Sequence, residues 1–143
     1  MGIPRDKLNA KALAAVEAAE RTGPPTIAWQ MVLPYPPTVN TYYRNINGRT
    51  LISKRGREYR HVVASMVASS GNKPMAGRLK ADIAVYLPDR RRRDLDNLLK
   101  GLMDSLQHGG AYKDDCQVRD YHIYDAGFDK PEGHVVVRLE AIE

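Results

Sequence analysis

Two carboxylates and a lysine gather in one short stretch, Asp94-Leu95-Asp96-Asn97-Leu98-Leu99-Lys100. The leucines recur at helical spacing and mark the buried face, so Asp96 and Lys100, four residues apart, share a solvent-facing side. Asp94 comes just before the periodic run, in the N-cap position, which holds its carboxylate near Asp96. Paired carboxylates on a rigid support are typical ligands of a hard cation such as Mg²⁺ or Mn²⁺.

A second acidic pair, Asp114-Asp115, follows the glycine turn at Gly109-Gly110. The turn allows the chain to return this pair towards the polar flank of the helix. Carboxylates around a divalent metal suit phosphodiester hydrolysis, because the metal activates water and neutralises charge on the phosphate. Lys100 would then either stabilise the negative charge that develops during the reaction or hold the attacking water.

Basic residues point to a polyanionic partner. The formal net charge is +5, and its densest cluster is the run Arg90-Arg91-Arg92-Arg93, directly before Asp94. Arginines offer bidentate contacts to phosphate. A second basic group comprises Arg49, Lys54, Arg55, Arg57 and Arg60. Its last four members either extend the candidate DNA surface or form a plain solvated helix face.

Each of these features also has an ordinary structural explanation. Asp94 suits a plain N-cap, and Asp96 suits compensation of the helix dipole. Asp96 and Lys100 suit a surface ion pair, Asp114-Asp115 suits a turn, and the arginine run suits a solvated connection. Only the combination of acidic and basic clusters indicates a metal-dependent enzyme that acts on nucleic acid.

The elements that position these residues follow from hydrophobic periodicity. We expect strands over 26–33, 49–52, 78–87, 118–124 and 135–141, helices over 53–69 and 95–108, and a loop over 38–48. Ser53 is the expected N-cap of the first helix. This order predicts an α+β fold, a single domain with a mixed β-sheet and helices packed on one face.

The same patterns predict buried side chains. On the first strand they are Ile27, Trp29, Met31 and Leu33. The stripe on the 53–69 helix comprises Tyr59, Val62, Val63, Met66 and Val67. Cys116, the single cysteine, is expected to be a small core residue.

Residues 1–25 differ from the rest of the chain. Alanine-rich helical spacing over 7–21 ends at Thr22-Gly23-Pro24-Pro25, which predicts a helical extension appended to a domain over 26–143. No apolar run approaches the ~18 residues needed to span a bilayer. We expect a soluble, cytoplasmic protein without a membrane partner.

Three stretches of the sequence together resemble the RusA family of Holliday junction resolvases. They are Pro88–Leu98 with Lys100, Asp114–Val118, and Leu33–Asn40 with Tyr42-Tyr43-Arg44. The resemblance runs from about residue 28 to the C-terminus. The extension at 1–25, and Gly101 in place of a better helix former, depart from the family pattern.

The resemblance implies a homodimeric nuclease that binds a four-way DNA junction and nicks two opposed strands with Mg²⁺ or Mn²⁺. It assigns metal binding and catalysis to Asp94, Asp96 and Asp115, and adds Lys100 as the essential lysine. Arg90, Arg91, Arg92, Arg93 and Arg44 are the expected DNA contacts, and no organic cofactor is expected. Such genes often travel with phages and prophages, which is a plausible origin here.

Two other functions fit the same residues. A non-catalytic basic module would bind DNA on a nuclease scaffold, but such a binder gains nothing from carboxylates beside DNA. A nuclease of broader range would act on branched or flapped DNA in general, and the sequence does not separate it from a junction resolvase.

Overall fold

Apolar residues at every second position build the central strand, β4 (Arg78–Leu87), in which Leu79, Ala81, Ile83 and Val85 are each 0% exposed. The computed structural model describes residues 9–14 and 27–142. In the described chain β4 lies between two neighbours, so both of its edges are hydrogen-bonded. The apolar alternation therefore forms the centre of the core, as predicted.

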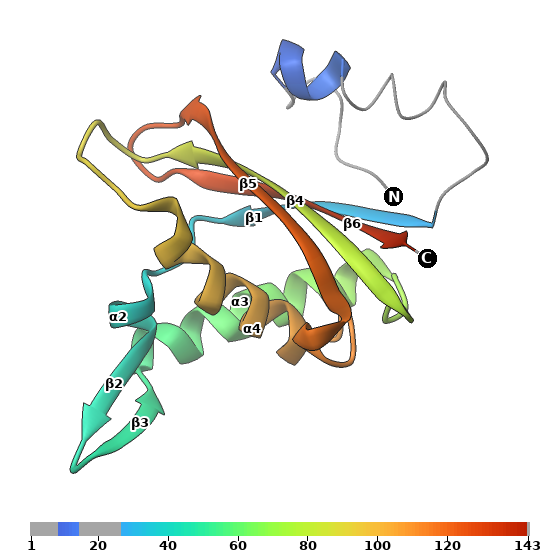
Figure 1. Cartoon of the computed structure of the whole chain (residues 1–143). Helices are drawn as coiled ribbons and strands as arrows, with labels where there is room; N and C mark the ends of the chain where they lie inside the picture. Colours follow the sequence, from blue (N-terminus) through green and yellow to red (C-terminus); the bar gives the residue numbers. More distant parts are fainter. Residues whose placement is uncertain (1–8, 15–26, 143) are drawn as a thin grey trace.

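A four-stranded mixed sheet surrounds β4, in the order β1-β6-β4-β5 (Figure 1). The other strands are β1 (Ala28–Pro34), β5 (Val118–Phe128) and β6 (His134–Ile142). β6 pairs antiparallel with both β1 and β4, whereas β4 and β5 pair in parallel. A parallel pair requires a crossover connection, and here the crossover contains the candidate acidic residues.

Two helices cover one face of this sheet (Figure 1). They are α3 (Lys54–Ser70) and α4 (Leu99–His108), and α4 follows a 3-10 turn, η2 (Leu95–Leu98). Val63 and Val67 of α3 and Leu102 and Leu106 of α4 are at most 2% exposed, and all join the core of the sheet. The predicted α+β fold, with a mixed sheet and helices on one face, is confirmed.

The loop predicted over 38–48 is wrong. This segment contains a short helix, α2 (Val39–Tyr42), and a strand, β2 (Tyr43–Ile46), which pairs with β3 (Arg49–Ile52) in a separate two-stranded sheet. Asn47 and Gly48 between the strands have φ angles of 50° and 76°, as a two-residue hairpin turn requires. Of the asparagines that suggested a loop, Asn40 lies in α2, whereas Asn45 and Asn47 belong to the hairpin.

Several predictions of burial are also wrong. Ile27, expected inside, is 74% exposed because it precedes the first residue of β1, and Val62 is 42% exposed. Val62 lies one residue, or about 100° around the helix, from the buried Val63. Cys116 is exposed because it lies in the surface turn η3 (Asp115–Gln117). Trp29, 5% exposed, is confirmed as core.

The described part of the N-terminal segment lies on the face of the sheet opposite α3 and α4 (Figure 1). Residues 10–14 are helical, Asn9 Nδ2 donates to the carbonyl of Ala126, and Lys11 Nζ lies 5.5 Å from the Tyr124 ring centre. Of the helix predicted over 7–21, Asn9 precedes the helical residues, and residues 7, 8 and 15–21 fall outside the described residues. Among those that are described, no helix has the length and apolar character needed to cross a membrane.

The packing of α3 gives a direct test. Val63→Ala should lower the free energy of unfolding by about 2 kcal/mol, because it removes two buried methyl groups and leaves a cavity. Val62→Ala is the matched control. It should change stability by less than about 0.5 kcal/mol, because that side chain is largely exposed. Urea unfolding measures both, and equal losses would contradict this orientation of α3.

Candidate active site

The candidate site begins where the chain enters η2. Asp94 occupies the N-cap position, as predicted, but its side chain makes no capping hydrogen bond within the described structure. Instead its backbone carbonyl accepts from the amide of Asn97 at 3.2 Å. The first turn of the predicted 95–108 helix is thus a 3-10 turn, and the exposed Asp94 carboxylate is not used to start it.

One pocket brings together three of the four residues expected to carry out the chemistry. Asp96 and Lys100 line it from the start of the helix, and Asp115 lines it from η3. The Nζ of Lys100 lies 4.0 Å from Oδ2 of Asp115. The return of the second acidic pair towards the polar flank of the helix is therefore confirmed for Asp115. Further lining residues are Leu99, Met103, Cys116, Val118, Arg119 and Tyr121.

Two glutamines that the sequence analysis missed hold Asp115 in place. Gln107 of α4 accepts a hydrogen bond at 2.9 Å from the backbone amide of Asp115. Gln117 accepts from the amide of Asp114 at 3.0 Å and donates to the carbonyls of Met75 and Gly77. The capping-box spacing of Asp114 and Gln117 is a local signal that could have found Gln117. No spacing rule singles out Gln107, which meets Asp115 across the turn.

Asp114, next to Asp115, has a structural task. Its carboxylate accepts from the backbone amide of Cys116 at 2.9 Å and, with Gln117, forms a capping box at the start of η3. The hydrogen bond from that amide holds the pKa of Asp114 below its ordinary value. Asp114 therefore shapes the turn, and Asp115 lines the pocket.

The arginine run is not uniform. Arg93 NH2 lies 2.7 Å from Oδ2 of Asp89, its Nε donates to Oδ1 at 3.3 Å, and its guanidinium lies 5.7 Å from the Tyr35 ring centre. These hydrogen bonds from Arg93 lower the pKa of Asp89. Arg93 is thus engaged within the chain and only partly exposed. Arg90, Arg91 and Arg92 are exposed, with Arg91 Nε 3.9 Å from Asp89 Oδ2 and the Arg90 guanidinium 5.2 Å from the Phe128 ring centre.

A buried polar cluster lies beneath the same helix. Tyr42, 0% exposed, donates its hydroxyl hydrogen bond to Asp104, which is one turn after Lys100. Arg60 of α3 completes the cluster, with NH2 2.7 Å from Asp104 Oδ2 and Nε donating to Tyr42 Oη at 2.8 Å. Burial, followed by the bond to Asp104, raises the pKa of Tyr42 to about 12. The sequence grouped Arg60 with surface cations, but the structure pairs it with Asp104.

Gly101 has a packing reason that the sequence could not reveal. A Cβ atom there would lie 2.9 Å from Cδ2 of Tyr42 and 3.4 Å from the carbonyl oxygen of Pro37. Both neighbours belong to the segment that leads into the hairpin. A better helix former is excluded at this position because the ring of Tyr42 occupies the space.

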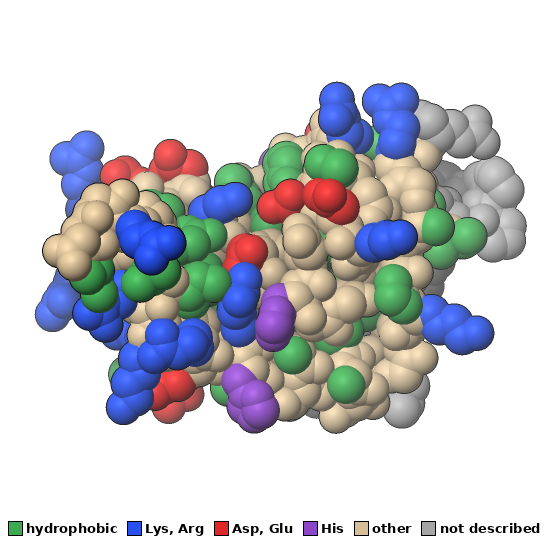
Figure 2. Space-filling view, turned by 90° about the horizontal axis from the view of Figure 1, so that it is seen from below, with side chains coloured by type: hydrophobic (Ala, Val, Ile, Leu, Met, Phe, Trp, Pro, Cys, Tyr) green, Lys and Arg blue, Asp and Glu red, His purple; other side chains and the backbone are tan. Residues whose placement is uncertain are grey.

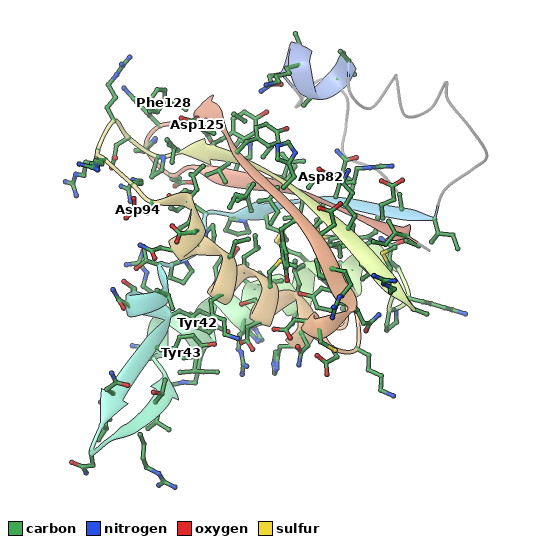
Figure 3. All side chains as sticks on the ribbon, in the orientation of Figure 1. Tyr42, Tyr43, Asp82, Asp94, Asp125 and Phe128 are labelled. Atoms are coloured by element: carbon green, nitrogen blue, oxygen red, sulfur yellow. The ribbon has the colours of Figure 1, made fainter. Side chains whose placement is uncertain are left out.

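The donor set suits a divalent metal, although only in part. Carboxylate oxygens are the ligands Mg²⁺ prefers, and it commonly takes one or two of them together with water and substrate phosphate. Asp96 and Asp115 supply two at one pocket. Within the described residues no three His, Cys, Asp or Glu side chains converge as a metal cluster. Asp94 does not line the pocket and lies where the chain enters η2 (Figure 3).

Comparison with known proteins places these residues in a family. The family model described as Endodeoxyribonuclease RusA matches residues 34–140. The crossover junction endodeoxyribonuclease rusA of Enterobacteria phage HK97 is 39% identical over 116 residues, 80% of this chain and 96% of that protein. The proteins of the same name from Enterobacteria phage 82 and Escherichia coli K12 are 45% and 43% identical over 96 residues, 66% of this chain and 80% of each relative.

The contact between Gly101 and Tyr42 predicts that alanine at position 101 lowers the stability of the fold. Glycine to alanine within a helix ordinarily stabilises by up to about 1 kcal/mol. Gly101→Ala should instead lower the free energy of unfolding by roughly 1–3 kcal/mol, because it overpacks a buried ring. In a Tyr42→Ala background the same change should lose most of its cost. Urea unfolding of all four chains measures this, and additive effects would contradict the contact.

Proposed function

Because the chain belongs to the RusA family of endodeoxyribonucleases, we propose that it is a Holliday junction resolvase, an endonuclease that nicks opposed strands of four-way DNA junctions. The observation that carries the proposal is the single pocket lined by Asp96, Lys100 and Asp115, inside the segment that the family model matches. Relatives named crossover junction endodeoxyribonuclease, from phages and from Escherichia coli, support the junction as substrate. Such an enzyme would act in the cytoplasm, where its DNA is.

The proposed chemistry assigns a role to each acidic residue. Asp96 and Asp115 would hold a Mg²⁺ ion at the pocket, with Asp94 as a further ligand from the start of η2, and Mn²⁺ would substitute for it. When bound, the metal supplies Lewis-acid stabilisation of the phosphate and lowers the pKa of a water molecule. Lys100, 4.0 Å from Asp115, places its ammonium group at the same pocket and stabilises charge on the phosphate oxygens.

The arginines hold the substrate beside this pocket. Arg90, Arg91 and Arg92 are exposed on the loop before Asp94 and suit contacts to phosphates that flank the scissile bond. Arg93 acts through Asp89, because its guanidinium is already bound there. It fixes the shape of the loop that carries the other three.

The extent of the nuclease domain is also proposed. Residues 26–143 form the domain, and 1–25 are an appended extension. The family match over residues 34–140 supports this division, since it leaves the extension outside.

Neighbouring aspartates allow a sharp test of the proposed site. With a synthetic four-way junction and Mg²⁺, Asp115→Asn should slow cleavage on the order of 10²–10³-fold, because it removes a metal ligand and transition-state stabilisation. Asp114→Asn should stay within a few-fold of the native rate, since its carboxylate only shapes η3. Asp96→Asn should abolish cleavage while junction binding in EDTA persists.

The same assay separates the alternative functions. Paired nicks in opposed strands of the junction, with a matched linear duplex left intact, are the expected result. Equal cleavage of flaps and forks would favour a general branched-DNA nuclease. Binding without cleavage under Mg²⁺ or Mn²⁺ would leave only a DNA-binding module.

Symmetric cleavage also predicts a dimer. Two opposed nicks in a two-fold junction require two sites related by a two-fold axis. Light scattering coupled to size-exclusion chromatography should therefore give twice the 16.0 kDa of one chain. A mass of one chain, at the concentrations at which paired nicks occur, would contradict the dimer.

A further inference from the structure

The β2–β3 hairpin has no evident task in the core. Its two strands form a sheet of their own, and none of the other described strands pairs with them. The hairpin projects away from the main sheet, beyond α2 (Figure 1). Arg44, Asn45 and residues 47–51 are exposed. Because a two-stranded hairpin alone is at best marginally stable in water, a binding role explains its presence better than packing does.

The hairpin and the start of α3, together called the arm, carry charge of a single sign. Residues 43–57, which comprise the hairpin and the first turn of α3, contain no Asp or Glu and five basic residues, Arg44, Arg49, Lys54, Arg55 and Arg57. All five are exposed. Lys and Arg side chains gather at the left of Figure 2, the side on which Figure 1 draws the hairpin. A one-signed basic arm suits a polyanion.

The pairing register sorts the hairpin into two different faces. Arg44 is opposite Leu51 and Ile46 is opposite Arg49, and because side chains alternate along a strand, these four share one face. Leu51 is 47% exposed there. The other face carries the pair Asn45 and Thr50, whose side chains hydrogen-bond to each other at 2.9 Å. Only the first face presents two arginines with exposed aliphatic surface between them.

The root of the hairpin is fastened to the helix that carries Lys100. Tyr42, the residue before β2, hydrogen-bonds to Asp104 of α4, and its carbonyl accepts from the amide of Ser53 at 2.9 Å, just after β3. Figure 3 shows Tyr42 and Tyr43 at this root. A Cβ atom at Gly56 would collide with the Tyr42 carbonyl, so α3 also approaches the root closely. The arm is therefore held in a fixed place relative to the candidate site.

We propose that the β2–β3 hairpin is a second DNA contact, whose Arg44–Ile46–Arg49–Leu51 face lies against a duplex arm of the substrate outside the cleavage pocket. This inference rests on the proposed function, because it takes the substrate to be DNA. A two-stranded ribbon fits the major groove of a duplex, and the two arginines reach phosphates on its edges. The arm then aligns the duplex with the pocket through Tyr42 and Asp104.

Binding measured without cleavage tests the arm. In EDTA, Arg44→Gln with Arg49→Gln should weaken binding of a four-way junction roughly tenfold to a hundredfold. The slope of log K against log salt should fall by about 0.9 for each phosphate that the variant no longer neutralises. Lys73→Gln, which removes one exposed charge beyond the opposite end of α3, should change affinity less than about twofold and leave the slope unchanged. Asn45→Thr, on the other face of the hairpin, should also bind as the native chain does.

Two binding outcomes would overturn the inference. One is an unchanged salt slope in the double variant. The other is an equal loss of affinity in Asn45→Thr, which would mean that hairpin folding, and not the arginine face, is responsible.

A crosslink gives a second readout that does not depend on affinity. Asn47→Cys at the hairpin tip, in a Cys116→Ser background, carries a photoactivatable aryl azide. It should crosslink to a duplex arm of the junction, and crosslinking confined to a second protein chain would overturn the inference. If the native chain binds no junction at all, the proposed function fails instead. If the Arg44→Gln, Arg49→Gln variant binds and cleaves the junction as the native chain does, only the proposal about the hairpin fails.

Discussion

The parallel pairing of β4 with β5 is the constraint on which the arrangement of the site depends. Leu79 near the start of β4 is opposite Val118 at the start of β5, so the chain must travel back along the whole sheet between them. That return path contains the arginine loop, η2, α4 and η3, and it must cover the apolar face of the sheet on the way. Leu98, Leu102 and Leu106 meet this demand, each at most 1% exposed. Their burial fixes which flank of the helix is polar, and so Lys100 and Asp115 meet above the core.

Polar groups beneath α4 decide where the rest of the chain attaches. A buried tyrosine hydroxyl and a half-buried carboxylate are costly unless they are hydrogen-bonded, and Tyr42, Asp104 and Arg60 satisfy one another. Gly56 and Gly101 provide the space, since a side chain at either would meet Tyr42. The three residues come from α2, α4 and α3, so the cluster fastens three elements at one point. This cluster therefore sets the direction in which the hairpin leaves α2.

Sequence reasoning succeeded where one local pattern decides the structure. The leucines of 95–106 and the alternation of 79–87 gave the helix, the central strand and the buried faces, because burial of a continuous stripe dominates there. It failed at β2, whose four residues carry little pattern and are held by pairing with β3 and by the root at Tyr42. The acidic residues were found because they stand next to the periodic helix. Gln107, which holds the amide of Asp115, and Asp104, which binds Tyr42 and Arg60, were not found, because each acts on a residue that folding brings near. Gln117 was missed although its capping box with Asp114 is local.

Internal pairing divides the arginines into those that build the molecule and those that face outwards. Asp89 binds Arg93 and Asp104 binds Arg60, and these two cations hold a loop and a helix pair. The exposed arginines and lysine lie on the loop before Asp94 and on the hairpin arm. The acidic pocket lies between these two regions in the fold, because α4 follows the loop and contacts the root of the hairpin through Asp104. Phosphate contacts at two separate places constrain a duplex far more than contacts at one place, because they fix its direction as well as its position. A pocket of carboxylates repels phosphate, so cationic contacts on more than one side supply the attraction that carries a DNA backbone to it.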